Sequence, residues 1–184
     1  MSGCSQKRNE PAPGNENKIE FNIDYSLLDS DVVNKENKFR FSPPREWKNI
    51  SETQLKMATE RLQEALKIVK NYSILPIYIF VDKESNSVLN VAEIILPKDK
   101  SDINYYEKCI SGGPDSSNIR KARFEKDGIA IHQYMIQNDK NVNFKLFFLN
   151  RGKSIIQFDY IVPVKYYSSK IKQLESSIGS IKLI

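Results

Sequence analysis

The sequence of 184 residues is poor in the side chains that most often carry catalysis or hold a metal. It has a single histidine, His132, so any Ser-His, Cys-His or multi-histidine arrangement would have to rest on that residue alone. No Cys-x-x-Cys, His-x-x-x-His or His-Glu-x-x-His motif is present. The Gly112-Gly113 pair lacks the Gly-Lys-Ser/Thr pattern of a phosphate-binding loop. We therefore expect no catalytic residues, no cofactor and no metal site, and interpret the protein as non-enzymatic.

Long apolar runs and cysteines are also scarce. No run of about 18 apolar residues occurs, so the chain as given contains no transmembrane helix. Of the two cysteines, Cys4 lies in a segment whose composition predicts disorder, so a structural disulfide with Cys109 is not expected. Cys109 is interpreted as a small buried apolar group on a helix.

The charge is modestly basic, with a net value of +5. From Lys140 to Ile184 there are eight basic side chains and only the two acids Asp159 and Glu175. Such a bias favours an anionic surface, such as lipid headgroups, an acidic protein or nucleic acid, or is simply a solvated face. We expect no nucleic-acid partner, because the N-terminus, described next, indicates a lipid tether, and a lipid tether argues against one.

The N-terminus carries the most specific signal. Ser2-Gly3-Cys4 resembles the end of a bacterial lipobox, in which small residues precede a cysteine that is lipidated after signal-peptide cleavage. No charged region and no apolar region precede it, which fits a trimmed signal with Met1 added, or an ordinary cytosolic N-terminus. Ser5–Lys18 contains no large apolar residue and is rich in Pro, Gly, Asn and charges. We predict a disordered tether over residues 1–18, attached to the membrane by a lipid on Cys4.

A chain of 184 residues has the length of one domain with a tail, so residues 19–184 are predicted to form a single domain. Period-two alternation predicts an edge strand over Ile19–Tyr25 and a strand over Lys38–Ser42. Leu27-Leu28 and Val32-Val33 are expected in a loop. Trp47, after a Pro pair, is expected to cover the core. A helix is predicted over Ser51–Asn71, begun by a Ser51/Gln54 capping box.

The remaining chain predicts a sheet. Ile74–Asp82 is nearly continuous apolar sequence, which indicates a central strand covered on both faces. The other expected strands are Val88–Leu96, Gly128–Asn138, Val142–Asn150 and Lys153–Val162, and Ile119–Phe124 leads into the sheet. A short helix over Ser101–Ile110 and a closing helix over Lys165–Ile178 are expected, with Gly179 as the residue after the helix and Ser180–Ile184 as an extended tail. His132 is expected in a strand, in the core or at its edge.

Two segments resemble a known family. They are Phe39-Arg40-Phe41-Ser42-Pro43-Pro44 with Trp47, and the run from Phe158 to Pro163 followed by Tyr166 and by Ser176-Ser177-Ile178-Gly179-Ser180-Ile181. Together with the order of elements, they resemble the PsbP-like proteins, whose fold is shared with the Mog-type Ran-binding factor. The resemblance implies an α+β fold, an antiparallel β-sheet between helical layers in a three-layer α/β/α sandwich. The family includes lipid-anchored bacterial members and extrinsic subunits of membrane complexes, and it is not generally enzymatic.

Candidate partner-binding residues come from two aromatic doublets and the basic C-terminus. Tyr105-Tyr106 and Tyr166-Tyr167 stand near predicted helix starts, where one ring of each pair is expected to pack inward and the other to remain available to a partner. The candidates are Tyr105, Lys165, Tyr166, Lys170 and Lys172.

These features lead to three functional hypotheses. The first is a lipid-anchored, extracytoplasmic binding or accessory module of the bacterial cell envelope, with an envelope protein as partner. The second is a cytoplasmic adaptor that binds a protein through the basic C-terminal face. The third is a small-ligand enzyme whose site forms between Lys98–Asp127 and the sheet, in a deep polar pocket lined by His132 or several acids.

Overall fold

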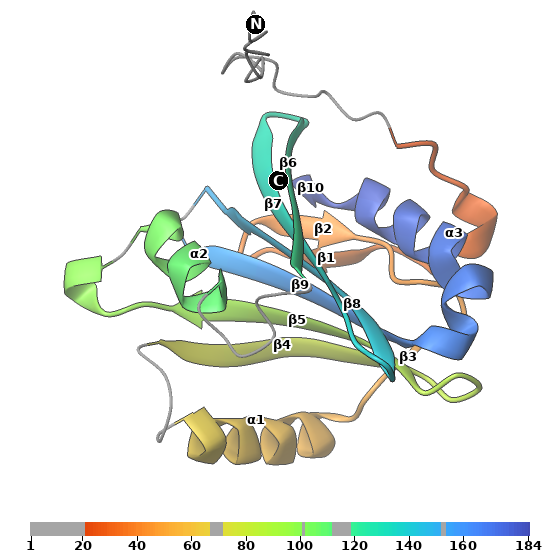
Figure 1. The fold of residues 1–184 in the computed structure, drawn as a ribbon, viewed down its shortest axis with the longest axis horizontal. Coiled ribbons are helices and arrows are strands. Elements are labelled where there is room, and N and C mark those ends of the chain that lie inside the picture. The colour runs from red at the N-terminus through yellow and green to blue at the C-terminus, as the bar shows by residue number, and fades with distance from the viewer. Residues whose placement is uncertain (1–20, 67–71, 101, 112–118, 152–153) are drawn as a thin grey trace, which may run out of the picture.

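The computed structural model describes residues 21–66, 72–100, 102–111, 119–151 and 154–184. A seven-stranded antiparallel sheet has the order β3-β4-β5-β9-β8-β7-β6, and a three-stranded sheet has the order β1-β2-β10 (Figure 1). The strands are β1 Val32–Asn34, β2 Phe39–Phe41, β3 Lys48–Asn49, β4 Ser73–Asp82, β5 Ser87–Ile95, β6 Ile119–Lys126, β7 Ile129–Gln137, β8 Asn141–Leu149, β9 Ile155–Pro163 and β10 Lys182–Leu183. The helices are α1 Glu52–Leu66, α2 Ile103–Ser111 and α3 Val164–Ser180, with 3₁₀ turns at Tyr25–Leu27 and Lys98–Lys100.

The large sheet lies between layers, as the sequence predicted. On one face α3 and the small sheet cover the main apolar core, which includes Phe39, Phe158 and Leu174. On the other face α2 covers a second cluster around Tyr106 and Phe147. Helix α1 runs along β4 (Figure 1). The α+β fold with an antiparallel sheet between helical layers is therefore confirmed. None of the described helices combines the length and apolarity needed to cross a membrane.

The Phe-Arg-Phe strand explains the first motif. Successive strand residues point to opposite faces, so Phe39 and Phe41 point to the same face and are fully buried, whereas Arg40 is exposed. The ring of Phe41 meets that of Phe158 on β9 edge to face, with centroids 4.9 Å apart. Such aromatic pairs contribute roughly 0.5–1.5 kcal/mol beyond the buried area. The small sheet thus forms a lid over the main core.

A buried serine network explains the second motif. The backbone N–H of Ser42 donates to Ser180 Oγ over 2.8 Å, and Ser177 Oγ donates to the Ser42 carbonyl over 2.7 Å. Ser177 Oγ also lies 2.9 Å from the Tyr160 hydroxyl. Because β2 ends at Phe41, these serines satisfy backbone groups that would otherwise be buried without partners. They join the small sheet, α3 and β9.

The N-terminal prediction was wrong in the described part. Residues 21–24 form no strand, and Tyr25–Leu27 is a 3₁₀ turn in which the Asp24 side chain accepts from the Ser26 N–H. Instead of pairing with a strand, Phe21 and Ile23 pack on α3 at Gly179. A Cβ at Gly179 would lie 2.7 Å from the Cβ of Phe21. Helix α3 continues to Ser180, so Gly179 lies inside its last turn and not after the helix as predicted.

Three other predictions need correction. Val32–Asn34 is not a loop but strand β1, which pairs with β2. Strand β4 is not central, because only the two-residue β3 lies beyond it, and its register shifts between Pro76 and Tyr78. Ile119–Lys126 is a full strand that ends the sheet.

Several local predictions are confirmed. Trp47 is buried in the main core and His132 is buried in β7. In the capping box, the Ser51 N–H donates to Gln54 Oε1 over 3.0 Å and the Gln54 N–H donates to Ser51 Oγ over 3.3 Å. The predicted helix residues 67–71 and the predicted tether at 1–18 lie outside the described residues.

Candidate functional site

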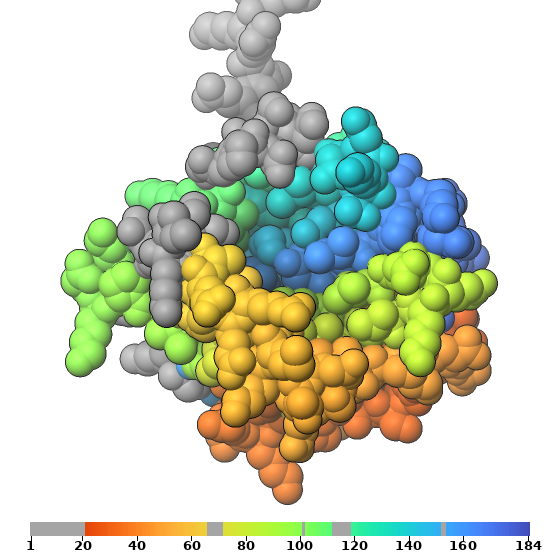
Figure 2. Space-filling model, turned by 90° about the horizontal axis from the view of Figure 1, so that it is seen from below, coloured from red at the N-terminus to blue at the C-terminus, as the bar shows by residue number. Residues whose placement is uncertain are grey.

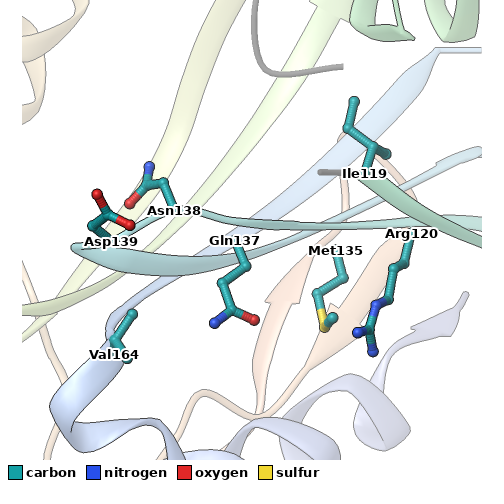
Figure 3. A pocket seen from close by; sticks show the side chains of 7 residues that line it. All are labelled: Ile119, Arg120, Met135, Gln137, Asn138, Asp139 and Val164. Carbon is teal, nitrogen blue, oxygen red and sulfur yellow. The ribbon is translucent and has the colours of Figure 1, made fainter. Parts of the chain in front are cut away.

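A pocket of about 460 Å³ lies beside the first residue of α3. It is lined by Ile119, Arg120, Met135, Gln137, Asn138, Asp139 and Val164. Figure 3 shows the side chains of Arg120, Met135 and Gln137 extending from β6 and β7 toward α3, whereas Ile119 points the other way. The pocket therefore combines a guanidinium, two amides and a carboxylate with apolar contacts. We call it the α3 pocket.

Local structure fixes the rim of the α3 pocket. Pro163, at the end of β9, starts α3 without a side-chain cap. The Val164 N–H donates to the carbonyl of Lys140 in the β7–β8 turn, over 2.9 Å. One turn into the helix, Tyr167 stacks on Phe144 of β8 with ring centroids 5.9 Å apart. Burial and the charge of Glu175 raise the pKa of Tyr167, and the nearby positive charge of Arg120 opposes that rise.

Two of the predicted partner-binding residues lie next to this pocket. Lys165 and Tyr166 directly follow the lining residue Val164. The Lys165 ammonium lies 4.7 Å from the centroid of the Tyr166 ring, a cation–π contact. Lys165 is exposed, whereas Tyr166 is half-buried and packs against the main core. At the start of α3, the Lys165 ammonium and part of the Tyr166 ring are therefore accessible to a partner, and packing against the core holds the ring in place.

The other predicted residues are not brought to the same place. The Lys170 ammonium is engaged, because it lies 2.8 Å from Asp82 and 3.8 Å from Glu84. Burial alone would raise the pKa of Asp82, but hydrogen bonds from Lys170, Ser85 and the Glu84 N–H hold it below the usual value.

Lys172 and Tyr105 complete the predicted set. Lys172 is exposed on α3, and Tyr105 lies on α2, which covers the opposite face of the sheet. Tyr105 carries the Lys100 ammonium 5.1 Å from its ring centroid. Cys4 lies outside the described residues.

Sequence reasoning missed a polar strip on the α2 face of the sheet. We define the polar strip as Asn90, Asn143, Lys145, Gln157 and Asp159, which come from β5, β8 and β9. Asn90 lies opposite Asp159, and Asp159 lies opposite Lys145. The Lys145 ammonium is 2.6 Å from Asp159 Oδ2, and both side chains are largely buried. Figure 2, seen from the α1 side, shows residues of β8 and β9 set back behind α1 and the β4–β5 turn.

The polar strip contains oxygens that lack donors among the described residues. These buried atoms are Asn90 Oδ1, Asn143 Oδ1 and Asp159 Oδ1. Burying an unpaired acceptor is costly, so the strip is a place where a ligand or water with N–H or O–H groups gains hydrogen bonds. Polar residues alternating with apolar ones in the two neighbouring strands, at Asn143/Lys145 and Gln157/Asp159, were the signal available in the sequence.

Beside the polar strip, His132, Glu107 and Tyr134 form a second polar group. Tyr134 donates to Glu107 over 2.6 Å, and burial followed by this bond raises the pKa of Tyr134 to about 12. His132 stacks on Phe147, and burial lowers the pKa of the imidazole although Glu107 opposes the shift. The imidazole is therefore neutral at pH 7, and its 3.6 Å approach to Glu107 is not a full ion pair.

Neither the α3 pocket nor the second pocket described below includes His132 in its lining. Within the described ranges, no three His, Cys, Asp or Glu side chains are grouped so as to hold a metal ion.

The fold places the chain in a class of α+β proteins in which helices cover both faces of an antiparallel sheet. Within that class it has the PsbP-like fold. It superposes on the solution structure of cyanobacterial PsbP (CyanoP) from Synechocystis sp. PCC 6803 with a TM-score of 0.56, over 89% of this chain and 96% of that one. The aligned residues are 13% identical, so the likeness concerns the fold. No family profile and no curated protein matches the sequence.

Proposed function

We propose that the chain is a non-enzymatic binding or accessory module of the bacterial cell envelope, held at the membrane by a lipid on Cys4. The Ser2-Gly3-Cys4 sequence, the polar spacer Ser5–Lys18 and the PsbP-like fold support this proposal. The observation that carries it is the position at which the N-terminal segment joins the domain, relative to the α3 pocket.

The N-terminal segment and the α3 pocket lie at opposite ends of α3. Phe21 packs against Phe124 of β6, with ring centroids 5.4 Å apart, and reaches Gly179 in the last turn of α3. The α3 pocket borders Val164, the first residue of the same helix. A helix of 17 residues spans about 25 Å. The N-terminal segment therefore joins the domain about a helix length away from the α3 pocket.

The lining of the α3 pocket suits a partner with both polar and apolar groups. Arg120 is exposed and has no carboxylate partner among the described residues. Met135 and Val164 provide apolar surface, and the Gln137 amide can donate and accept. Lys165 and Tyr166 extend this surface along α3. Such a mixture is typical of protein-binding surfaces, in which Arg, Met and Tyr are enriched.

The test is expression from the full natural reading frame, followed by membrane fractionation and intact mass. We expect the wild type in the membrane fraction with a lipid-sized mass increase. Cys4→Ala should abolish both, whereas Cys109→Ala, which removes the other thiol, should retain both. A soluble wild type with a free Cys4 thiol would refute the anchored module.

That outcome would favour the cytoplasmic adaptor. Its structural support is that Lys165 and Lys172 are exposed on α3 and that neither ammonium lies within 4 Å of a carboxylate among the described residues. A photo-crosslinking residue at Gln137, with one at Lys83 in the β4–β5 turn as control, then locates the partner. Crosslinking from Gln137 alone supports the α3 pocket as the binding surface, and equal crosslinking from both positions contradicts it.

A further inference from the structure

The two edges of the large sheet differ in how open they are. At one edge β3 covers part of β4, α1 runs along it, Pro76 lies within the strand and the register shifts after Pro76. Prolines, bulges and covering segments all hinder the addition of a further strand. At the other edge β6 pairs with β7 over all eight residues without a register shift and contains no proline. Of the two edges of the large sheet in the described part of the chain, β6 therefore has the regular geometry of an acceptor strand.

The backbone of β6 faces outward at every second residue. Asp127 and Gly128 form a two-residue turn, with φ values of 51° and 76°. Lys126 and Ile129 flank this turn and lie opposite each other, as in the hydrogen-bonded pair that closes a tight hairpin. By alternation, the N–H and C=O groups of Lys121, Arg123 and Glu125 point away from β7. No backbone hydrogen bond joins them to another described segment.

The side chains of β6 make this open edge basic. Arg120 and Arg123 are exposed and have no carboxylate partner among the described residues. Lys121 is partly engaged, with its ammonium 2.8 Å from Ser111 Oγ and over the Tyr134 ring. Lys126 is engaged by the Ile181 carbonyl and by Asp127. Two copies of such an edge repel each other, whereas an acidic strand is attracted.

Pockets adjoin both ends of β6. The α3 pocket includes Ile119 and Arg120 at its start. A second pocket of about 260 Å³ includes Arg123, Phe124 and Glu125 near its end, together with Gly128 and Ala130. In recognition by strand addition, main-chain bonds supply affinity and pockets for alternate side chains supply specificity. The β6 edge offers both.

We propose that β6 is the acceptor for an acidic, extended segment of a partner protein, which adds to the large sheet as an eighth strand. The segment bonds to the backbone of Lys121, Arg123 and Glu125, and its carboxylates pair with Arg120 and Arg123. This inference rests on the proposed function in that it names the partner class of the binding module. It does not require the lipid on Cys4.

The probe is a labelled synthetic peptide of the same length as β6 in which Glu-Glu and Val-Val pairs alternate. Each face of the added strand then carries carboxylates, as needed because Arg120 and Arg123 lie on opposite faces of β6. Three controls accompany it: the same peptide with Lys in place of Glu, the acidic peptide with alternate backbone nitrogens methylated, and an acidic peptide of equal length and charge in which Gly and Pro replace Val. We expect only the first peptide to bind. Amide exchange should show new protection at Lys121, Arg123 and Glu125 in the complex, while Ala122 and Phe124, which face β7, are protected with or without peptide.

Variants separate backbone pairing from charge. Glu125→Pro removes an N–H that points away from β7, and an edge strand tolerates proline at such a position. Glu125→Thr removes the same charge but keeps the N–H. We expect Glu125→Pro to weaken binding by roughly fivefold or more and Glu125→Thr to strengthen it slightly. Arg120→Glu with Arg123→Glu should weaken it by roughly tenfold or more, whereas Lys56→Glu with Lys83→Glu, an equal charge change at exposed lysines of α1 and the β4–β5 turn, should have little effect.

Several outcomes overturn the proposal. Equal binding of the methylated peptide, or equal affinities of Glu125→Pro and Glu125→Thr, would show attraction by charge alone, as for an anionic membrane or a nucleic acid. Absence of binding by the acidic peptide would refute the acceptor strand, as would self-association through β6. The proposed function fails by a different result, namely a wild type that is absent from the membrane fraction and has no lipid-sized mass increase. The two failures are therefore distinguishable.

Discussion

The Lys145 ammonium lies 2.6 Å from the Asp159 carboxylate, between neighbouring strands, with only 15% and 12% of the two side chains exposed. The second Asp159 oxygen is buried without a donor among the described residues. The Lys145–Asp159 pair is thus largely removed from water, and one carboxylate oxygen lacks a hydrogen bond. Removing one partner leaves a charge with neither water nor counter-ion.

Lys145→Met should therefore destabilise the protein by about 2–4 kcal/mol. The double variant Lys145→Met/Asp159→Leu should recover most of that loss, because apolar groups of similar size replace a buried pair at little cost. Lys140→Met, at an exposed lysine, should change stability by less than about 0.5 kcal/mol. Urea unfolding followed by the fluorescence of Trp47 measures all three. A loss at Lys145 no larger than at Lys140 would contradict a buried role for the pair.

Gly179→Ala should destabilise the protein although alanine favours helices. The new Cβ would lie 2.7 Å from Phe21 Cβ and 2.9 Å from Ile23 Cγ1, so the N-terminal segment must shift. We expect a net loss of about 1–3 kcal/mol from this overpacking. In a chain shortened to begin at Asp24, the same substitution should be neutral or stabilising, because only the gain in helix propensity remains. A similar loss in both chains would mean that the N-terminal segment is not the cause.

How much of the fold the sequence predicts depends on how many residues each apolar pattern spans. Alternation predicted β8 and β9 well because each has many residues and one face in the main core. It failed at Val32–Asn34, since three residues carry too little pattern and the strand depends on pairing with β2. At Phe21 and Ile23 the alternation was real, but it reflects packing on Gly179 and not a sheet.

The candidate sites depend on register, which no local pattern contains. Lys165 and Tyr166 could be named because they are adjacent in the chain. The contact of Lys145 with Asp159 needs the exact pairing of β8 with β9. The engagement of Lys170 by Asp82 needs α3, which packs on β8 and β9, to approach the end of β4. The open edge at β6 follows from the strand order of the whole sheet.

His132 should make the protein less stable in mild acid. Burial lowers the pKa of the folded imidazole below its ordinary value of 6.5, so the unfolded chain binds a proton first as the pH falls. The free energy of unfolding therefore falls as the pH drops below about 6.5, until the folded imidazole also titrates. His132→Gln should flatten the change between about pH 7.5 and about pH 5.5. If wild type and His132→Gln lose stability equally over that range, another group is responsible.

The acidic groups affect a separate pH range. Hydrogen bonds from Ser26, Asn104 and Lys126 hold the pKa values of Asp24, Asp102 and Asp127, respectively, below 3.8. The stability they contribute is fully present above that value and is lost only as the pH falls through the lower folded pKa values. The losses from His132 and from these acids should hence appear as two steps.

Helix α1 should open before the core of the domain does. None of its described side chains is buried, whereas α3 has six buried residues between Leu174 and Ser180. Amide exchange should show α1 opening at a lower free energy than global unfolding, and the C-terminal half of α3 opening only with it. Ser51→Ala removes the capping box and should destabilise α1 by about 1 kcal/mol, which speeds amide exchange in α1 by roughly fivefold and leaves α3 unchanged. Equal protection of α1 and α3, falling together in Ser51→Ala, would instead make α1 part of the cooperative core.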